Sequence, residues 1–158
     1  MLKKHPAKRS STVMTRLFFF LSLAALLSSC SHSFNKEWNA ALKAGPQPGI
    51  AGAWEGTWQS DINKHHGRLR SVVGPAKNSA GDHPFHYRAT WAGFLSGGYR
   101  VDHRVTGSKN TWQFNGQHQM PGWAGGLYTY EGTVKGDEFS ATYKCELDEG
   151  TFRMKRVK

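Results

Sequence analysis

Histidines are the residues of this chain best suited to acid-base or metal chemistry, because their pKa lies near neutrality and their ring nitrogens bind metal ions. The candidates beyond the N-terminal segment are His65, His66, His83, His86, His103 and His118. Adjacent histidines point to opposite faces of a strand, and His86 is expected to face outward, so no set converges as metal ligands must. His103 alone has the inward parity, and a single inward histidine is more often a hydrogen-bonded core group. We therefore predict no metal site and no cofactor.

Catalytic motifs give no further candidate. The chain has no G-x-S-x-G turn, no H-E-x-x-H helix and no phosphate-binding glycine loop. Cys145 lacks a histidine nearby in the sequence that could activate it, and the paired carboxylates Asp137–Glu138 and Asp148–Glu149 fall in turns, where charged residues are ordinarily solvated. We expect a protein that is not an enzyme, with the alternative that catalytic groups meet only in space.

Tryptophan and tyrosine offer binding chemistry instead, because each combines a flat apolar ring with a polar group. The predicted ligand-binding wall consists of Trp58, Tyr87, Trp91, Tyr99, His103, Trp112, Tyr128 and Tyr143. The same side chains suit a plain core, so two alternatives stay open: a shallow pocket at the mouth of a barrel, or a filled interior. Since each ring buries roughly 150–250 Å², we expect no lipid-sized cavity.

These aromatic residues lie in segments that alternate between apolar and polar positions. In the first segment, Gly52–Ser60, both tryptophans share one parity with two glycines, as on a strand with one dry face. Seven further segments repeat this alternation: His66–Val73, Phe85–Trp91, Tyr99–Thr106, Thr111–Asn115, Leu127–Val134, Glu138–Cys145 and Gly150–Arg156. Glycine-rich turns separate most of them, and the longer loop Gln117–Gly126 is expected to cap an end or line a mouth.

Eight short antiparallel strands without an internal helix fit an all-β fold, either an up-and-down barrel or a two-sheet sandwich. We favour the eight-stranded antiparallel barrel, because a barrel leaves no open strand edges and no strand here is charged enough to protect one.

The first thirty residues have the features of an export signal: basic residues without acids, then the apolar run Leu17–Leu27, which is shorter than the ~20 residues of a membrane span. The sequence Leu-Ser-Ser-Cys at 27–30 resembles the bacterial lipobox, which implies lipidation of Cys30 and a membrane anchor. Because Ser31 follows the cysteine where an aspartate would favour the inner membrane, the resemblance implies a cell-envelope lipoprotein of the outer membrane. The alternative is an ordinary secretory signal cut near Ser29.

Three regions follow from these boundaries: a signal peptide at 1–30, a tether at 31–49 and a barrel domain at 50–158. Within the tether, Phe34, Trp38 and Leu42 recur every fourth residue, which predicts a short amphipathic helix. The glycines and prolines of Gly45–Gly49 would then form a stiff spacer. Trp38 would either plug one end of the domain or rest in the lipid interface.

The formal net charge of +10 overstates the basicity of the exported part, because five of the 21 lysines and arginines lie in the first thirty residues. The remaining 16 face 11 acidic residues, a modest surplus. We therefore expect no nucleic-acid partner. The basic side chains of the predicted outer surface would instead favour an anionic envelope component: Arg68, Arg70, Arg88, Arg100 and Arg104.

The G-x-W at Gly52–Trp54 resembles the lipocalin signature, and the Gly-Thr-Trp at 56–58 resembles the start of avidin-type chains. The run Tyr128–Arg156 looks like the tail of bacterial lipocalin-like lipoproteins. Lipocalins and avidins are both calycin barrels. The resemblance to calycins covers most of residues 52–156 and implies a barrel in which Trp54 packs across a closed end. It also implies that an arginine of the last strand stacks on that tryptophan, either Arg153 or Arg156, of which Arg156 has the inward parity.

Two functions remain open on the sequence alone. In the first, a membrane-anchored lipoprotein binds a small amphipathic or sugar-like molecule at the barrel mouth. In the second, the barrel is filled and the outer surface of the lipoprotein docks on an envelope partner or anionic polymer.

Overall fold

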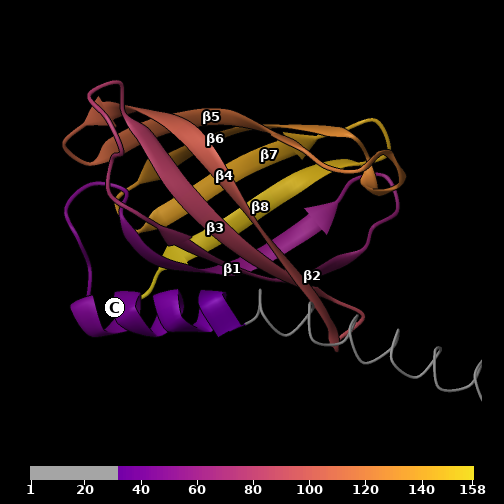
Figure 1. Cartoon of the computed structure of the whole chain (residues 1–158), viewed down its shortest axis with the longest axis horizontal. Helices are drawn as coiled ribbons and strands as arrows, with labels where there is room; N and C mark the ends of the chain where they lie inside the picture. Colours follow the sequence, from indigo (N-terminus) through magenta and orange to yellow (C-terminus); the bar gives the residue numbers. More distant parts are fainter. Residues whose placement is uncertain (1–31) are drawn as a thin grey trace, which may run out of the picture.

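The computed structural model describes residues 32–158 as one helix followed by a closed barrel of eight antiparallel strands (Figure 1). The strands are β1 (Gly52–Ser60), β2 (His66–Val73), β3 (Asp82–Trp91), β4 (Leu95–Ser108), β5 (Thr111–Gln119), β6 (Leu127–Lys135), β7 (Glu138–Lys144) and β8 (Glu149–Arg156). Each strand pairs with the next, and β8 returns to pair with β1 from Trp54↔Arg156 to Ser60↔Gly150. The predicted up-and-down barrel is therefore confirmed.

Three strands are longer by at least three residues than the alternation predicts. β3 begins at Asp82, β4 begins at Leu95, and β5 continues to Gln119. The added residues include glycine, proline and histidine, which carry no clear apolar or polar label, so the period-two pattern fades before the strand ends. The loop after β5 shortens accordingly to residues 120–126 and contains a single 3-10 turn, η1 (Gly122–Ala124).

The long strand β4 changes partners along its length. It pairs with β3 from Leu95 to Arg104 but with β5 only from His103 to Ser108. The first part of β4, before His103, has no partner in β5. The wall of the barrel therefore opens between these two strands toward the end where β4 begins.

The core is aromatic, because inward positions of adjacent strands carry rings at matching heights. The ring of Phe85 lies 4.5 Å from His103, 5.3 Å from Phe114 and 6.3 Å from Phe139, measured between centroids. Each of these side chains is at most 2 % exposed. Rings that bury on the order of 150–250 Å² each are the main source of hydrophobic stabilisation in this barrel.

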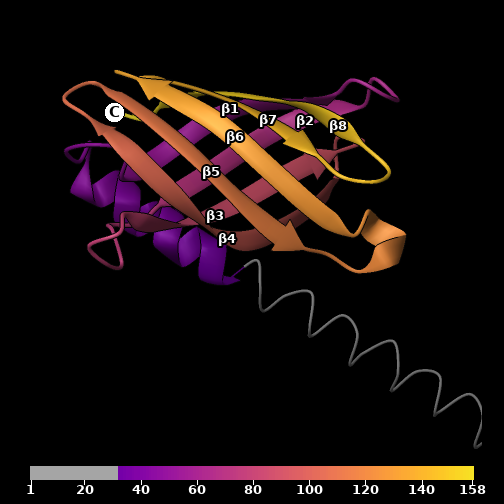
Figure 2. The same ribbon diagram turned by 90° about the horizontal axis from the view of Figure 1, so that it is seen from above.

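The two ends of the barrel differ in what covers them (Figures 1 and 2). Residues 45–51 and the C-terminus lie at the end where β1 begins, and Ile50 packs there beside Trp54 in the core. We call it the closed end. The opposite end is formed by the loops 61–65, 92–94, 120–126 and 145–148, and we call it the open end.

The N-terminal helix (32–44) lies along the outside of the barrel. Phe34 and Trp38 pack on Ala53, an outward-facing residue of β1, and the guanidinium of Arg70 lies 4.9 Å over the Trp38 ring. Both expectations for Trp38, as a plug of one end or a residue in the lipid interface, are therefore wrong. Leu42 is 42 % exposed, so the fourth-residue pattern contributes only its first two members to packing.

The helix also fixes a charged cluster on β3 and β4. Glu37 accepts a hydrogen bond from the ring of His86 at 2.9 Å and forms an ion pair with Arg100. His86 faces out of the barrel, as predicted, but the helix covers it, and only 6 % of it is exposed. Burial acts to raise the pKa of Glu37, and the hydrogen bonds from His86 and Arg100 outweigh it and lower that pKa.

Residues 45–49 contact the barrel and so are not a free spacer. The guanidinium of Arg156 donates hydrogen bonds to the carbonyls of Gly49, at 2.5 Å, and Ala51, at 2.7 Å. A Cβ on Gly49, whose φ is +74°, would meet the Trp112 ring at 3.5 Å. This segment therefore covers the closed end of the barrel.

Candidate functional site

The open end gathers five of the eight residues predicted to line a ligand site. Inward residues near the ends of the strands bring their side chains together there: Trp58 of β1, Trp91 of β3, Tyr99 of β4, Tyr128 of β6 and Tyr143 of β7. Trp91 is 39 % exposed, Trp58, Tyr99 and Tyr128 are half-buried, and Tyr143 is buried. The aromatic surface thus passes from solvent-exposed to buried at this end of the barrel.

The two tryptophans lie against the β3–β4 hairpin. The indole N–H of Trp58 donates a hydrogen bond to the Thr90 carbonyl at 2.9 Å. The Trp91 ring lies on Gly97, where a Cβ would come within 2.9 Å of the ring. The absence of a side chain at Gly97 therefore allows Trp91 to lie flat along the rim of the open end.

The tyrosine hydroxyls at this end are held by the loops. Tyr128 donates to the Ala124 carbonyl at 3.0 Å, and Tyr143 donates to Asp148 at 2.8 Å. The other oxygen of Asp148 accepts a hydrogen bond from Ser60 at 2.6 Å. Burial raises the pKa of Tyr143, and the neighbouring Asp148 carboxylate raises it further, so the phenol stays neutral at physiological pH.

His118 also lies at this end, whereas the sequence pattern predicted inward parity for His103 alone. That expectation is wrong, because β5 continues past Asn115 and carries His118 to the inner face. The His118 ring stacks on Tyr99 with centroids 5.5 Å apart, across the split between β4 and β5. The signal that could have found it is parity with Trp112 and Phe114, extended through Gly116.

Tyr87 and His103 lie deeper and are sealed from solvent, with 0 % exposed. The Tyr87 hydroxyl is 3.3 Å from Nε2 of His103. Burial lowers the pKa of His103 to about 4, and the backbone of Asn115 and the charge of Asp102 offset this only in part. His103 is therefore a neutral core residue at pH 7.

Trp112 lies at the opposite end. It pairs with Gly107 and Val134 near the closed end and contacts Gly49. The eight predicted wall residues therefore occupy three levels of the barrel, with five near the open end, two in the sealed middle and one near the closed end.

Trp54 and Arg156 meet at the closed end. The Arg156 guanidinium lies 4.3 Å over the Trp54 ring, and the Trp54 indole donates to the Ile50 carbonyl at 3.0 Å. Arg153, the other arginine considered for this place, points outward and lines a hollow on the outer wall. The stacking pair joins the first strand, the last strand and the segment that covers this end.

The arginines expected to form a basic docking surface are largely engaged within the molecule. Arg68 and Arg70 both pair with Glu55, Arg104 pairs with Asp82 at 2.5 Å, and Arg100 pairs with Glu37. The charge that these side chains present to a partner is therefore partly neutralised. Exposed pairs of this kind are weak and are screened by salt.

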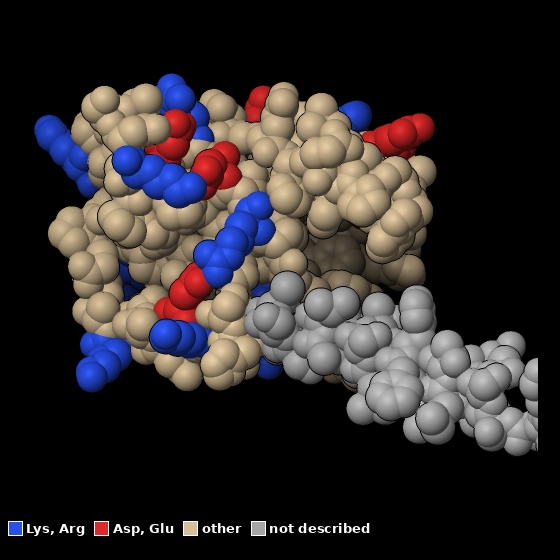
Figure 3. Space-filling view, viewed as in Figure 1, with Lys and Arg blue, Asp and Glu red and all other residues tan. Residues whose placement is uncertain are grey.

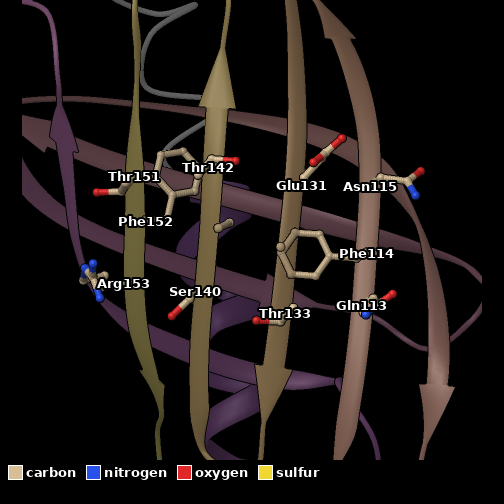
Figure 4. A pocket seen from close by; sticks show the side chains of 12 residues that line it. Gln113, Phe114, Asn115, Glu131, Thr133, Ser140, Thr142, Thr151, Phe152 and Arg153 are labelled. Atoms are coloured by element: carbon tan, nitrogen blue, oxygen red, sulfur yellow. The ribbon is translucent and has the colours of Figure 1, made fainter.

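On the face seen in Figure 3, most charged side chains lie over the closed end and the middle, and fewer lie toward the open end. A separate hollow of about 460 Å³ lies on the outer wall of β5 to β8 and is drawn in Figure 4. Its rim consists of outward polar side chains such as Gln113, Thr133, Ser140 and Thr151. Phe114 and Phe152 also line it but are only 2 % and 6 % exposed, so little aromatic surface there is open to a ligand.

Within residues 32–158, no group of three or more histidine, cysteine, aspartate or glutamate side chains is placed to hold a metal ion. In the same part of the chain, no helix has the length and apolarity needed to cross a membrane. Cys30 and the apolar run before it lie outside the described residues.

A scan against protein-family models and searches of curated proteins and of solved structures found no match to this chain. The eight-stranded barrel is shared by several families. The resemblance to lipocalins and avidins therefore stays a prediction.

Proposed function

We propose that this protein is a membrane-anchored lipoprotein whose barrel binds a small amphipathic or sugar-like molecule at its open end. The observation that carries the proposal is the aromatic rim formed by Trp58, Trp91, Tyr99 and Tyr128, which stays partly exposed above a filled interior. A half-buried aromatic surface with nearby polar groups suits a ligand with one apolar and one polar face.

The filled interior limits the size and depth of the ligand. Tyr87, His103 and Phe152 occupy the level below the rim, with Phe152 only 6 % exposed. A ligand would therefore lie across the rim. The hydroxyls of Tyr128 and Tyr143 already donate to the protein, so each would act toward a ligand chiefly as an acceptor.

Trp58 at the open end and Trp112 at the closed end give a matched pair of variants that tests the binding site on the full chain. The probe is n-octyl glucoside below its micelle concentration, because it joins a sugar to an alkyl chain, and its affinity is measured by titration calorimetry. We expect saturable binding at one site, weakened roughly three- to tenfold by Trp58→Phe through lost stacking. Trp112→Phe, at the closed end, should leave the affinity unchanged.

Equal losses in the two variants, or no saturable binding at all, would contradict this site. Absence of binding together with salt-sensitive retention on an anionic polymer would favour the second function, a filled barrel that docks on an envelope component. The filled core supports that alternative, and the internal pairing of Arg68, Arg100 and Arg104 argues against it.

The membrane anchor is tested separately by intact-mass measurement of protein extracted from membranes. The proposal requires diacyl or triacyl mass on Cys30 and loss of residues 1–29. A chain that still carries Met1 would remove the anchor from the proposal without affecting the binding site.

A further inference from the structure

The exposed apolar side chains of this barrel are concentrated at one end. Among the described residues, eight large apolar side chains are exposed, and seven of them lie on or beside the open-end loops. They are Ile62, Trp91, Phe94, Leu95, Trp123, Leu127 and Leu147, and Phe94 and Trp123 are 81 % and 86 % exposed. Scattered surface leucines are normal, but a set that recurs in every loop of one end marks an interaction surface.

Two loops of the open end contribute most of this surface. Residues 91–97, around the β3–β4 turn, carry Trp91, Phe94 and Leu95, and residues 117–127, between β5 and β6, carry Trp123 and Leu127. Neither stretch contains a lysine, arginine, aspartate or glutamate. The two loops lie on either side of the split between β4 and β5, where His118 stacks on Tyr99, and we call the two uncharged stretches together the apolar edge.

The start of the described chain lies on the same side of the molecule. Ser33 and Asn35, in the first turn of the helix, hydrogen-bond to Arg100 of β4 and Arg88 of β3, whose outer faces lead to the β3–β4 turn. The other end of the helix leads to residues 45–49, which contact Arg156 at the closed end. Cys30 precedes the helix by two residues, so a lipid there would join the protein on the side of the apolar edge.

We propose that the apolar edge, residues 91–97 and 117–127, lies in the surface of the bilayer that holds the N-terminal lipid. Tryptophan, phenylalanine and leucine are the side chains that partition into the membrane interface, where tryptophan is especially favoured. A contact of this kind adds a second attachment to the anchor and sets the orientation of the barrel. The inference rests on the proposed anchor, and the apolar edge shares Trp91 with the rim proposed to bind a ligand.

Quenching of tryptophan fluorescence by brominated lipid tests the contact on the full chain. The protein is purified from membranes and reconstituted into phosphatidylcholine vesicles with either brominated or ordinary acyl chains. We expect quenching that is reduced at least twofold by Trp123→Phe and further by combination with Trp91→Phe. Trp112→Phe is the matched control at the closed end and should leave the quenched component in place.

A second pair of variants leaves every tryptophan unchanged. Phe94→Ser combined with Leu127→Ser should weaken insertion of the apolar edge roughly tenfold or more and lower the quenching of Trp123. Leu42→Ser, at the exposed leucine of the helix, is the control and should have no effect. Near-ultraviolet circular dichroism checks that each variant keeps its packed core.

Wild-type protein that is not quenched, or quenching that Trp91→Phe and Trp123→Phe leave intact, would overturn the inference. A dimer in detergent that dissociates in the Phe94→Ser, Leu127→Ser variant, with no quenching in vesicles, would also overturn it, because a second copy would then cover the edge. If Cys30 carries acyl mass but the tryptophans are not quenched, only this inference is overturned and the proposed anchor stands. Absence of acyl mass defeats the proposed anchor, and n-octyl glucoside titration reports on the rim in either case.

Discussion

The two ends of this barrel carry different kinds of residue. At the closed end, Trp54 is fully buried between Ile50 and Arg156, and the loops carry lysine, asparagine and aspartate. At the open end, every loop carries an exposed large apolar side chain, although the loops 61–65 and 145–148 also carry charged residues, and the core below ends in half-buried rings. The closed end therefore combines dry packing with a charged surface, as expected of a structural end.

The difference separates residues that support the stability of the barrel from residues that are available for interaction. Residues at the closed end contact the first strand, the last strand and the segment after the helix, so a change there affects closure of the whole barrel. The apolar side chains of the open-end loops, such as Phe94 and Trp123, are mostly exposed and pack on little of the fold. Exposed apolar side chains lower solubility, which a binding role would offset. Substitutions at the two ends should therefore separate stability from binding.

The largest effect is expected at the closed end. Trp54→Ala removes a buried ring, its hydrogen bond to Ile50 and the stacking of Arg156, and should lower the free energy of unfolding by about 3–5 kcal/mol. Urea unfolding followed by circular dichroism measures it. A loss below about 1 kcal/mol would show that residues 45–51 and Arg156 hold this end without the tryptophan.

A smaller effect is expected from pH, through the sealed His103. Its pKa is lowered from the ordinary 6.5 to about 4 in the folded state, so the unfolded chain takes up the proton first as pH falls. The folded state should therefore be most stable above pH 6.5 and lose roughly 3 kcal/mol as pH falls toward 4. Urea unfolding at several pH values measures this slope.

The control for that slope is His103→Phe, which places a ring between Phe85 and Phe114 and cannot titrate. The variant should lose most of the pH dependence between 6.5 and 4, although it also removes the partner of the Tyr87 hydroxyl. An unchanged slope in the variant would assign the dependence to other groups.

The barrel could be predicted from the sequence because each strand has one dry face. In Tyr99–Thr106, for example, every second residue is apolar or aromatic except His103, and the structure places that set inside. Period-two alternation records which face is buried, but it fades at Gly97 and Gly116, which have no side chain to place. The strand ends, the split beside β4 and the position of His118 were missed for that reason.

The place of the helix depends on contacts that a helical pattern does not encode. Phe34 and Trp38 predict an apolar face but leave open what that face covers. A signal was present in β2, where Val72 stands at an outward position among arginines, since an outward valine beside an outward Ala53 indicates a covered wall. The contacts of Arg156 with the carbonyls of Gly49 and Ala51 involve main-chain atoms and leave no mark in side-chain periodicity.

The smallest effect on stability is expected at the open end, where Trp123→Ser removes a tryptophan that is 86 % exposed. The free energy of unfolding of the detergent-solubilised protein should change by no more than about 0.5 kcal/mol, because the ring packs on little of the fold. The variant thus pairs with Trp54→Ala: one tryptophan is lost at each end, but only the loss at the closed end should lower stability markedly. If Trp123→Ser instead lowers the free energy of unfolding by more than about 2 kcal/mol, the η1 loop folds back on the barrel in solution, and its ring serves the core at that end as Trp54 does at the other.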